Sequence, residues 1–262
     1  MQLVQLEVDA RSGIAQLRFN RPHVLNAIDV PMARALRDQV NVLAADPRVR
    51  CVVLSGQGKA FLAGGDLAPL VEDFGHAPQV VDDLLDAMYP AIEGLRSINA
   101  PVIAAVHGAV AGAGLSLMAG CDLVLAAEGT RFLMAFDRVG LPPDCGGTYY
   151  LPRLIGPRHM AELYLLGSTL TAEQAQALGL VNRVVPATEL VARSQQWAEQ
   201  IASGPTRACG EFKRLVGRSL SSTLPEQLEA ERAAVQAAML TEDFRAGAGA
   251  FMAHQWPRFA GH

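Results

Sequence analysis

The stretch PVIAAVHGAVAGAGLSLMAGCDLVLAA, residues 101–127, decides the fold class. It begins with the apolar run 102–106, passes through a glycine turn, continues as a small-residue segment at 112–119 and ends in the apolar run 123–127. Short apolar runs bounded by turn residues predict buried strands, and the segment between them predicts a helix. The sequence therefore predicts a strand–helix–strand crossover, the unit of a parallel sheet in an α/β protein.

The same region is long enough to suggest a membrane span. Residues 100–121 hold no formally charged side chain, and about 20 apolar residues suffice to cross a bilayer. Pro101, His107 and four glycines interrupt the run, however. These interruptions favour a strand, a turn and a helix, so we expect no membrane-spanning segment.

Five more elements are expected on the N-terminal side of this stretch. Residues 3–8 and 13–19 alternate apolar and polar side chains around a polar turn, which predicts a hairpin. Residues 29–46 predict a helix, and the apolar run 51–54 predicts a strand. Residues 79–98 predict a long amphipathic helix.

Strand patterns nearly disappear after residue 155. Helical patterns take their place, at residues 157–166, 171–178, 188–202, 205–219, 225–239 and 242–253. No linker long enough to separate independent domains interrupts the chain. The last third of the chain is therefore expected to be helical.

The composition excludes several classes of protein. Of 262 residues, 50% are hydrophobic and 18% are charged, which excludes a disordered chain. The 22 basic residues include only two lysines, Lys59 and Lys213, and the formal net charge is -4. Because no basic tract is present to hold a phosphate backbone, nucleic acid is not an expected partner.

Cysteine and histidine spacing argues against a metal site. The four cysteines lie far apart without a C-x-x-C pair, and the six histidines form no zinc-binding pattern. We therefore expect that the protein binds no structural metal and resides in a reducing compartment. The first ten residues lack a basic start before an apolar run, so they do not resemble a signal peptide. A cytoplasmic location is the expectation.

Two glycine-rich turns are the candidate functional elements. FLAGGD, residues 61–66, follows the third expected strand, and HGAVAGAG, residues 107–114, follows the fourth. Glycine lets the main chain approach a ligand closely, and the start of a helix adds free N–H groups. Two such donors aimed at one oxygen form an oxyanion hole. The alternative is that these glycines only let a strand and a helix pack closely.

Motifs spread over nearly the whole chain together resemble the enoyl-CoA hydratase/isomerase (crotonase) superfamily. They are Arg21-Pro22 with Leu25-Asn26-Ala27, the turn at 61–67, and the turn at 108–114 with Cys121-Asp122 after it. Residues 132–136 and 140–148 most resemble the branch that isomerises ring-epoxidised phenylacetyl-CoA in phenylacetate degradation.

The resemblance implies an α/β fold, the ClpP/crotonase spiral of ββα units with a helical C-terminal region. A core domain at residues 1–195 and a C-terminal helical oligomerisation region at 196–262 are expected. The family likeness also implies a homotrimer, or a hexamer built as a dimer of trimers.

The resemblance further implies the roles of individual residues. The backbone N–H groups of Gly65 and Ala113 are expected to donate to a thioester oxygen, and one such donor contributes about 3–4 kcal/mol to an enolate-like transition state. The acyl pocket is expected from residues 73–85 and 149–151. The residues expected to border the CoA substrate are Arg21, Val24, Ala27, Ala63, Gly65, Asp66, Leu67 and Ala113.

Departures from the family pattern bear on the reaction. Hydratases of the family use two glutamates, and the matching positions here hold Ser116 and Phe136. Asp144 stands where isomerase-type members carry an aspartate, in an apolar turn whose partial desolvation would raise the pKa of its carboxyl and make it a workable base. The alternative is that Asp144 caps the helix that follows it.

The predicted function is an acyl-CoA isomerase with Asp144 as its base, acting on 3-enoyl-CoA or ring-epoxidised phenylacetyl-CoA in phenylacetate or fatty-acid degradation. The alternative activity is an enoyl-CoA hydratase, a lyase, that uses substitute acids. A non-catalytic, RNA-binding member of the family is disfavoured by the two lysines and the intact glycine turns. No permanently bound cofactor is expected, because coenzyme A enters as part of the substrate.

Overall fold

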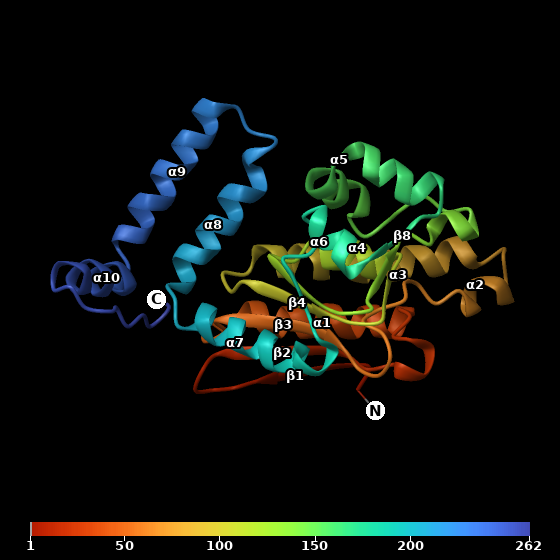
Figure 1. Cartoon of the computed structure of the whole chain (residues 1–262), viewed down its shortest axis with the longest axis horizontal. Helices are drawn as coiled ribbons and strands as arrows, with labels where there is room; N and C mark the ends of the chain where they lie inside the picture. Colours follow the sequence, from red (N-terminus) through yellow and green to blue (C-terminus); the bar gives the residue numbers. More distant parts are fainter. Residues whose placement is uncertain (1) are drawn as a thin grey trace.

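A six-stranded sheet organises the structure, a computed structural model that describes residues 2–262 (Figure 1). Its strand order is β1-β2-β3-β4-β6-β9, and only the β1–β2 pair is antiparallel. The N-terminal hairpin and the parallel crossover expected from the sequence are therefore confirmed. The strands are β1 (Val4–Val8), β2 (Ile14–Phe19), β3 (Cys51–Gly56), β4 (Val102–Val106), β6 (Leu123–Ala127) and β9 (Arg183–Val185).

A second, three-stranded sheet turns the chain into a spiral. After β4 and again after β6, the chain crosses to this sheet, in which β5 (Ala109–Ala111), β7 (Arg131–Leu133) and β8 (Thr169–Thr171) pair in that order. Gly108 makes the first crossing at φ +62°, and a Cβ atom there would lie 1.9 Å from the Lys59 carbonyl oxygen. The sequence did not predict these strands, because three residues are too few to show a period of two.

Helices cover both faces of the larger sheet. On one face lie α1 (Val30–Ala45) and α3 (Ala77–Ser97), whose apolar sides join Val52 and Leu54 of β3 in the main buried cluster. On the other face, α7 (Leu190–Ala202) covers Val53 and other residues of a second cluster. Side chains alternate along a strand, so near-continuous apolar runs such as β3 and β4 supply both clusters.

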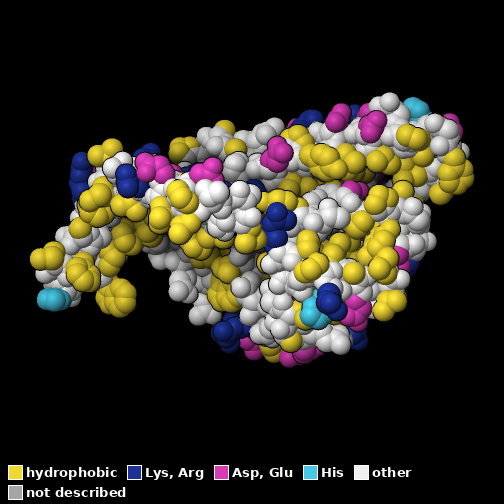
Figure 2. All heavy atoms as spheres, turned by 90° about the horizontal axis from the view of Figure 1, so that it is seen from above, with side chains coloured by type: hydrophobic (Ala, Val, Ile, Leu, Met, Phe, Trp, Pro, Cys, Tyr) yellow, Lys and Arg dark blue, Asp and Glu magenta, His cyan; other side chains and the backbone are white. Residues whose placement is uncertain are grey.

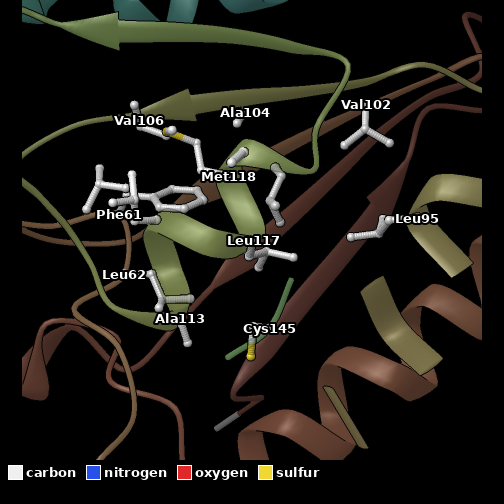
Figure 3. Close-up of a cluster of buried hydrophobic side chains, with 14 of the residues drawn as sticks. Phe61, Leu62, Leu95, Val102, Ala104, Val106, Ala113, Leu117, Met118 and Cys145 are labelled. Carbon is white, nitrogen blue, oxygen red and sulfur yellow. The ribbon is translucent and has the colours of Figure 1, made fainter. Parts of the chain in front are cut away.

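Three helices lie around the second sheet. The fully buried α4 (Ala113–Ala119) begins at the second glycine turn, and in Figure 3 Phe61 and Leu62 lie beside it. Helix α6 (Ala172–Ala177) starts with the Thr171–Gln174 capping box. Helix α5 (Gly147–Leu165) starts ten residues earlier than residue 157, because two helices meet at a kink at Gly156. The short α2 (Ala68–Glu72) was not predicted.

The last three helices extend away from the sheets, as Figure 1 shows. They are α8 (Thr206–Ser219), α9 (Leu224–Met239) and α10 (Glu242–Met252), which confirms the expected helical end of the chain. Residue 195 lies inside α7, which packs on the larger sheet, so the division of the chain at 195/196 stays a prediction. No helix in the described range 2–262 is long and apolar enough to cross a membrane.

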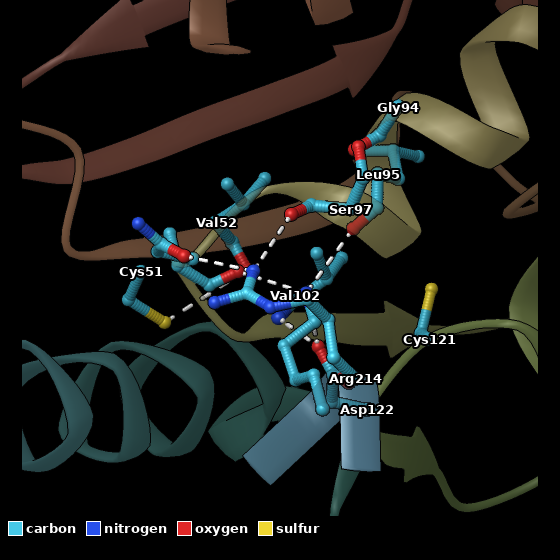
Figure 4. Close-up of polar contacts among 12 residues, drawn as sticks. Cys51, Val52, Gly94, Leu95, Ser97, Val102, Cys121, Asp122 and Arg214 are labelled. Carbon is cyan, nitrogen blue, oxygen red and sulfur yellow. Dashed lines mark hydrogen bonds and ion pairs between the residues drawn. The ribbon is translucent and has the colours of Figure 1, made fainter. Parts of the chain in front are cut away.

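One buried ion pair fastens α8 to the core. The Nζ atom of Lys213 lies 2.9 Å from Oδ2 of Asp122, and it also donates to the carbonyl oxygens of Leu95 (3.1 Å) and Ala100 (3.0 Å). The same Asp122 oxygen accepts from the Val102 N–H at 2.8 Å. Figure 4 shows Asp122 beside Val102 and Leu95. Since the Lys213 side chain is 4% exposed, its ammonium group depends on these acceptors in place of water.

We expect Lys213→Met to lower the free energy of unfolding by about 3–5 kcal/mol, because removal of one partner of a buried ion pair leaves the other without compensation. The other lysine provides a matched control, since Lys59 is exposed and Lys59→Met should change the free energy by no more than about 0.5 kcal/mol. Urea denaturation of both variants measures the difference. Equal, small losses would show that the pair does not stabilise this junction.

Candidate active site

A cavity of about 430 Å³ lies where the two glycine turns meet α1, α2 and α3. Both turns contribute to its lining, and so do the segment before α5 and one face of α3. The lining residues are Ile28, Asp29, Val30, Pro31, Ala63, Gly64, Gly65, Asp66, Leu67, Pro69, Leu70, Val80, Val81, Leu84, Gly112, Ala113, Ala135, Phe136, Val139, Leu141 and Asp144.

The two glycine turns are in direct contact. Leu62 forms an isolated parallel bridge with Val110, and the Ala111 N–H donates to the Leu62 carbonyl at 3.0 Å. Further along, a Cβ atom added to Gly112 would lie 3.4 Å from Cα of Gly64. Gly64 has φ +101° and Gly112 has φ +52° and ψ −125°. Only glycine adopts the Gly112 conformation readily, so the turn depends on it.

Gly65 and Ala113 each follow one of the contacting glycines and present a free donor. Within residues 2–262, neither backbone N–H has a hydrogen-bond acceptor in the protein. Both residues line the cavity. A Cβ atom on Gly65 would meet nothing within 4 Å, so the space in front of it is open. Ala113 is the first residue of α4, where unpaired N–H groups and the helix dipole favour a negative oxygen.

Asp144 is the last residue along the sequence that lines the cavity, and its side chain is a carboxylate. Its Oδ1 atom is buried and has no hydrogen-bond partner among the described residues. Burial raises the pKa of this carboxyl above its ordinary value of 3.8, and the neighbouring Cys145 thiol opposes the shift to a smaller extent. The backbone beside it is held in an uncommon conformation, with Cys145 at φ +50° and Gly146 at φ +81°.

The alternative role of Asp144 as a helix cap is wrong. Gly146 is the N-cap residue of α5, and no side chain caps this helix. Asp144 contacts the helix start only through its backbone carbonyl, which accepts from the Gly147 N–H at 2.9 Å. Its side chain is therefore free to act in the cavity.

The rest of the lining is apolar apart from carboxylates. Much of the apolar surface comes from α2, α3 and the loops before α1 and α5, through the side chains of Ile28, Leu70, Val80, Val81, Leu84, Phe136, Val139 and Leu141. The polar side chains are those of Asp29, Asp66 and Asp144. Since none of these lining residues has a hydroxyl, amide or cationic side chain, the hydrogen-bond donors of the cavity are its backbone N–H groups.

The two positions that match the hydratase glutamates hold no acid. Ser116 is fully buried in α4, outside the cavity lining, and its hydroxyl lies 3.4 Å from the Gly112 carbonyl oxygen. Phe136 lines the cavity and presents a ring. Neither residue can take up or release a proton at the cavity at neutral pH.

The structure brings together most of the residues expected to border the substrate, but not all. Ala63, Gly65, Asp66, Leu67 and Ala113 line the cavity, whereas Arg21, Val24 and Ala27 do not. The guanidinium group of Arg21 is instead bound to Asp29 and Asp66.

Only one of the two segments expected to form the acyl pocket lines the cavity. From residues 73–85, α3 supplies Val80, Val81 and Leu84. Residues 149–151 lie outside the lining, because the Tyr149 ring packs under Arg153, at 3.7 Å, and edge-on to Tyr150. Asp29 also lines the cavity, which the sequence did not predict: its position at the start of a helix is a local feature, but its approach to the cavity depends on long-range packing. In the described part of the chain, no group of three or more His, Cys, Asp or Glu side chains could hold a metal ion.

Comparisons with known proteins agree with the geometry. The enoyl-CoA hydratase/isomerase family profile matches residues 9–262. The chain is 38% identical over 250 residues to the 1,2-epoxyphenylacetyl-CoA isomerase of Escherichia coli K12, with 95% of both chains covered. It is 33% identical over 256 residues to a "probable enoyl-CoA hydratase" of Rhodobacter capsulatus, with 98% of both covered.

Solved structures give the same result for the fold. A crystal structure of an enoyl-CoA hydratase from Polaromonas superposes with a TM-score of 0.91 at 31% identity, and the match covers 98% of this chain and 99% of that one. A crystal structure of an enoyl-CoA hydratase from Mycobacterium smegmatis gives a TM-score of 0.92 at 30% identity, with 99% of both chains covered. The crotonase-like fold expected from the sequence is confirmed.

We expect Asp144→Asn to raise the melting temperature at neutral pH. The pKa of Asp144 is higher in the folded protein than in the unfolded chain, so folding favours the protonated form, and stability falls as the pH rises through the folded-state pKa. The asparagine variant is free of this loss. Its advantage should therefore shrink as the pH is lowered toward 3.8.

Calorimetry at several pH values measures this difference, and Asp82→Asn, an exposed carboxylate on α3, is the control. The control should show no such pH-dependent gain. A melting temperature of Asp144→Asn equal to that of the original chain at every pH would contradict the raised pKa.

Proposed function

Because the chain belongs to the enoyl-CoA hydratase/isomerase family, we propose that it is an acyl-CoA isomerase whose base is Asp144. A single observation carries this proposal. One largely apolar cavity holds two unpaired backbone N–H groups, from Gly65 and Ala113, together with one buried carboxylate whose pKa is raised. This set of groups suits proton removal next to a carbonyl group.

In the proposed reaction, the thioester oxygen accepts hydrogen bonds from the Gly65 and Ala113 N–H groups. The ionised Asp144 takes a proton from the carbon next to the thioester, and the electron pair of that C–H bond moves toward the carbonyl oxygen. The two N–H groups stabilise the resulting negative charge, which forms in a low-dielectric environment where such hydrogen bonds are strongest. Asp144, now a carboxylic acid, returns the proton to another carbon of the conjugated system and regains its charge.

The absence of a second acid at the hydratase positions favours isomerisation. Hydration needs one group to activate water and another to protonate carbon. Ser116 and Phe136 supply neither, and Asp144 alone can both remove and return a proton. Hydratase activity remains the alternative, since relatives described as hydratases match at 33% identity.

The cavity lining bears on the proposed substrate. Its side chains are apolar apart from three carboxylates, so an uncharged, hydrocarbon-rich acyl group fits it best. The proposed substrates are 3-enoyl-CoA and ring-epoxidised phenylacetyl-CoA, which would place the enzyme in fatty-acid or phenylacetate degradation. The second substrate is also supported by the 38% identity to the Escherichia coli isomerase.

A trimer, or a hexamer of two trimers, is part of the proposal. Figure 2 shows hydrophobic side chains gathered on the end of the molecule formed by α8 to α10. A surface of this kind is expected at an interface between protein chains. Exposed apolar residues of this region are Phe212, Val216, Leu220, Leu224, Leu228, Val235, Met239, Leu240, Phe251 and Trp256.

One absorbance assay tests the function and separates the two activities. Isomerisation of 3-enoyl-CoA creates a conjugated enoyl thioester and raises its absorbance, whereas hydration of crotonyl-CoA removes it. We expect the first activity to be strong and the second to stay below about 10 per second, the rate of a typical enzyme.

Asp144→Asn should lower kcat for isomerisation about a hundredfold or more, with acyl-CoA binding within a few-fold. Efficient hydration, or an unchanged kcat in Asp144→Asn, would contradict the isomerase assignment.

A second test concerns the oxyanion hole. Ala113→Pro removes one of the two proposed donors, and proline is tolerated at the first position of a helix. We expect the rate to fall about 150- to 1000-fold, since one donor contributes about 3–4 kcal/mol. Ala113→Ser, which keeps the N–H, is the control and should lose far less. Near-normal turnover in a folded Ala113→Pro protein would refute the role of this N–H.

A further inference from the structure

The guanidinium group of Arg21 is enclosed by three acceptors. Its Nη2 atom lies 3.1 Å from Oδ2 of Asp66 and 3.2 Å from Oδ2 of Asp29, and Nη1 donates to the Ala27 carbonyl. The side chains are 12% exposed for Arg21, 20% for Asp29 and 17% for Asp66. Two carboxylates therefore neutralise this cation inside the protein.

In the sequence, Asp29 and Asp66 each come directly after one of the two residues of a backbone bridge. Ile28 and Gly65 form an isolated parallel bridge, in which the Ile28 N–H donates to the Gly64 carbonyl and the Asp66 N–H donates to the Ile28 carbonyl, both at 2.8 Å. In a parallel bridge, one partner uses the peptide groups on either side of the other, so the N–H of Gly65 itself points away from Ile28. This bridge thus sets the direction of a donor of the oxyanion hole.

Asn26 fixes the same loop from its other end. Its side chain is fully buried, and its Nδ2 atom donates to the carbonyl oxygens of Gln57 (2.9 Å), Ala60 (2.8 Å) and Phe61 (3.2 Å). Its Oδ1 atom accepts from the Arg21 N–H at 2.8 Å. The backbone of Asn26 has φ +60°, a left-handed conformation that asparagine tolerates better than most other residues. Residues 62–66 are thus held at one end by Asn26 and at the other by Arg21.

We propose that Arg21 is a positioning residue for the oxyanion hole: through Asp29 and Asp66 it holds the Ile28–Gly65 bridge, and so it aims the Gly65 N–H at the thioester oxygen. This inference rests on the function proposed above, and it replaces the role of Arg21 as a residue that binds CoA. Without the cation, two enclosed carboxylates would repel each other on either side of the bridge. A lysine keeps the charge but cannot bind three acceptors in one plane.

The test uses the Asp144→Asn protein, which is expected to bind acyl-CoA with a kcat lowered about a hundredfold or more, and cinnamoyl-CoA as the probe. Polarisation of the carbonyl group of this conjugated thioester moves its absorption to longer wavelength, so the size of the shift at saturation reports the oxyanion hole. We expect Arg21→Gln in this background to lose at least half of the shift, with Kd within about threefold. Arg21→Lys should lose an intermediate part. Arg48→Gln, which removes an exposed arginine paired with Asp46, is the matched control and should keep the full shift.

Turnover gives a second readout. In the chain with Asp144 intact, Arg21→Gln should lower kcat for isomerisation about tenfold to a hundredfold, with KM within about threefold, because small errors in the position of a catalytic group have effects of this size. A residue that binds CoA would show the reverse pattern, a raised KM and Kd with kcat and the spectral shift unchanged. That pattern, or no change in any of the four quantities, would overturn the proposal.

Asp29→Asn keeps the test decisive if Arg21→Gln does not fold. Asp29 caps α1 by accepting from the Met32 N–H at 2.9 Å, and asparagine is an equally good cap. The variant therefore removes one ion pair while the helix start is retained. We expect a smaller but measurable loss of the spectral shift, and an unchanged shift would overturn the proposal. If the Asp144→Asn protein itself binds cinnamoyl-CoA without any shift, the oxyanion function fails, which is a different outcome from failure of the Arg21 role.

Discussion

The contact between the two glycine turns is the constraint on which the site depends. The spiral places the segments after β3 and β4 next to each other, so residues 64 and 112 come into van der Waals distance. Both have a positive φ, so a side chain at either position would strain the backbone. Because Gly65 and Ala113 come directly after these residues, the same contact brings their N–H groups to one cavity. Main-chain packing thus brings the two proposed donors to one cavity, and the ion pairs of Arg21 hold the loop that carries one of them.

The apolar environment of the cavity favours the proposed chemistry but lowers the stability of the fold. It would strengthen hydrogen bonds to an oxyanion at the proposed donors, and it raises the pKa of Asp144, which suits the proposed role of a base that also returns its proton. The same desolvation makes the ionised carboxylate unfavourable for folding. The left-handed backbone at Cys145 adds a further cost of about 1 kcal/mol or more. Stability is therefore lost at the residues that surround the base, as is common at functional sites.

The C-terminal helices show a different balance of forces. Lys213 fastens the start of this region to the loops next to β4 and β6, where its charge is matched by Asp122. Beyond that anchor, α8 to α10 leave many large apolar side chains exposed. These helices have little of their own core to hold them in place, so association with other copies of the chain would complete their packing.

The sequence alone determined the long elements and indicated the two turns as candidate functional elements. Alternation over six residues fixed the hairpin, helical periodicity fixed α1 and α3, and glycine at 64, 65, 112 and 114 identified the candidate donors. Asp144 also followed from the sequence, as the acid at a position where the resemblance implied one. Each of these signals is local, because it depends on neighbours within one turn, strand or motif.

Only the tertiary structure decided the rest. The three-residue strands of the second sheet carry no periodic pattern, and each pairs with a strand 22 to 40 residues away in the sequence. The sequence predicts Arg21 at the border of the CoA substrate, which stays a prediction, and it left open whether Asp144 caps a helix. The structure pairs Arg21 with Asp66, 45 positions away, and it shows that the buried Asp144 side chain caps no helix. A side chain's partners and its distance from water are set by segments remote in sequence, and no local pattern contains that information.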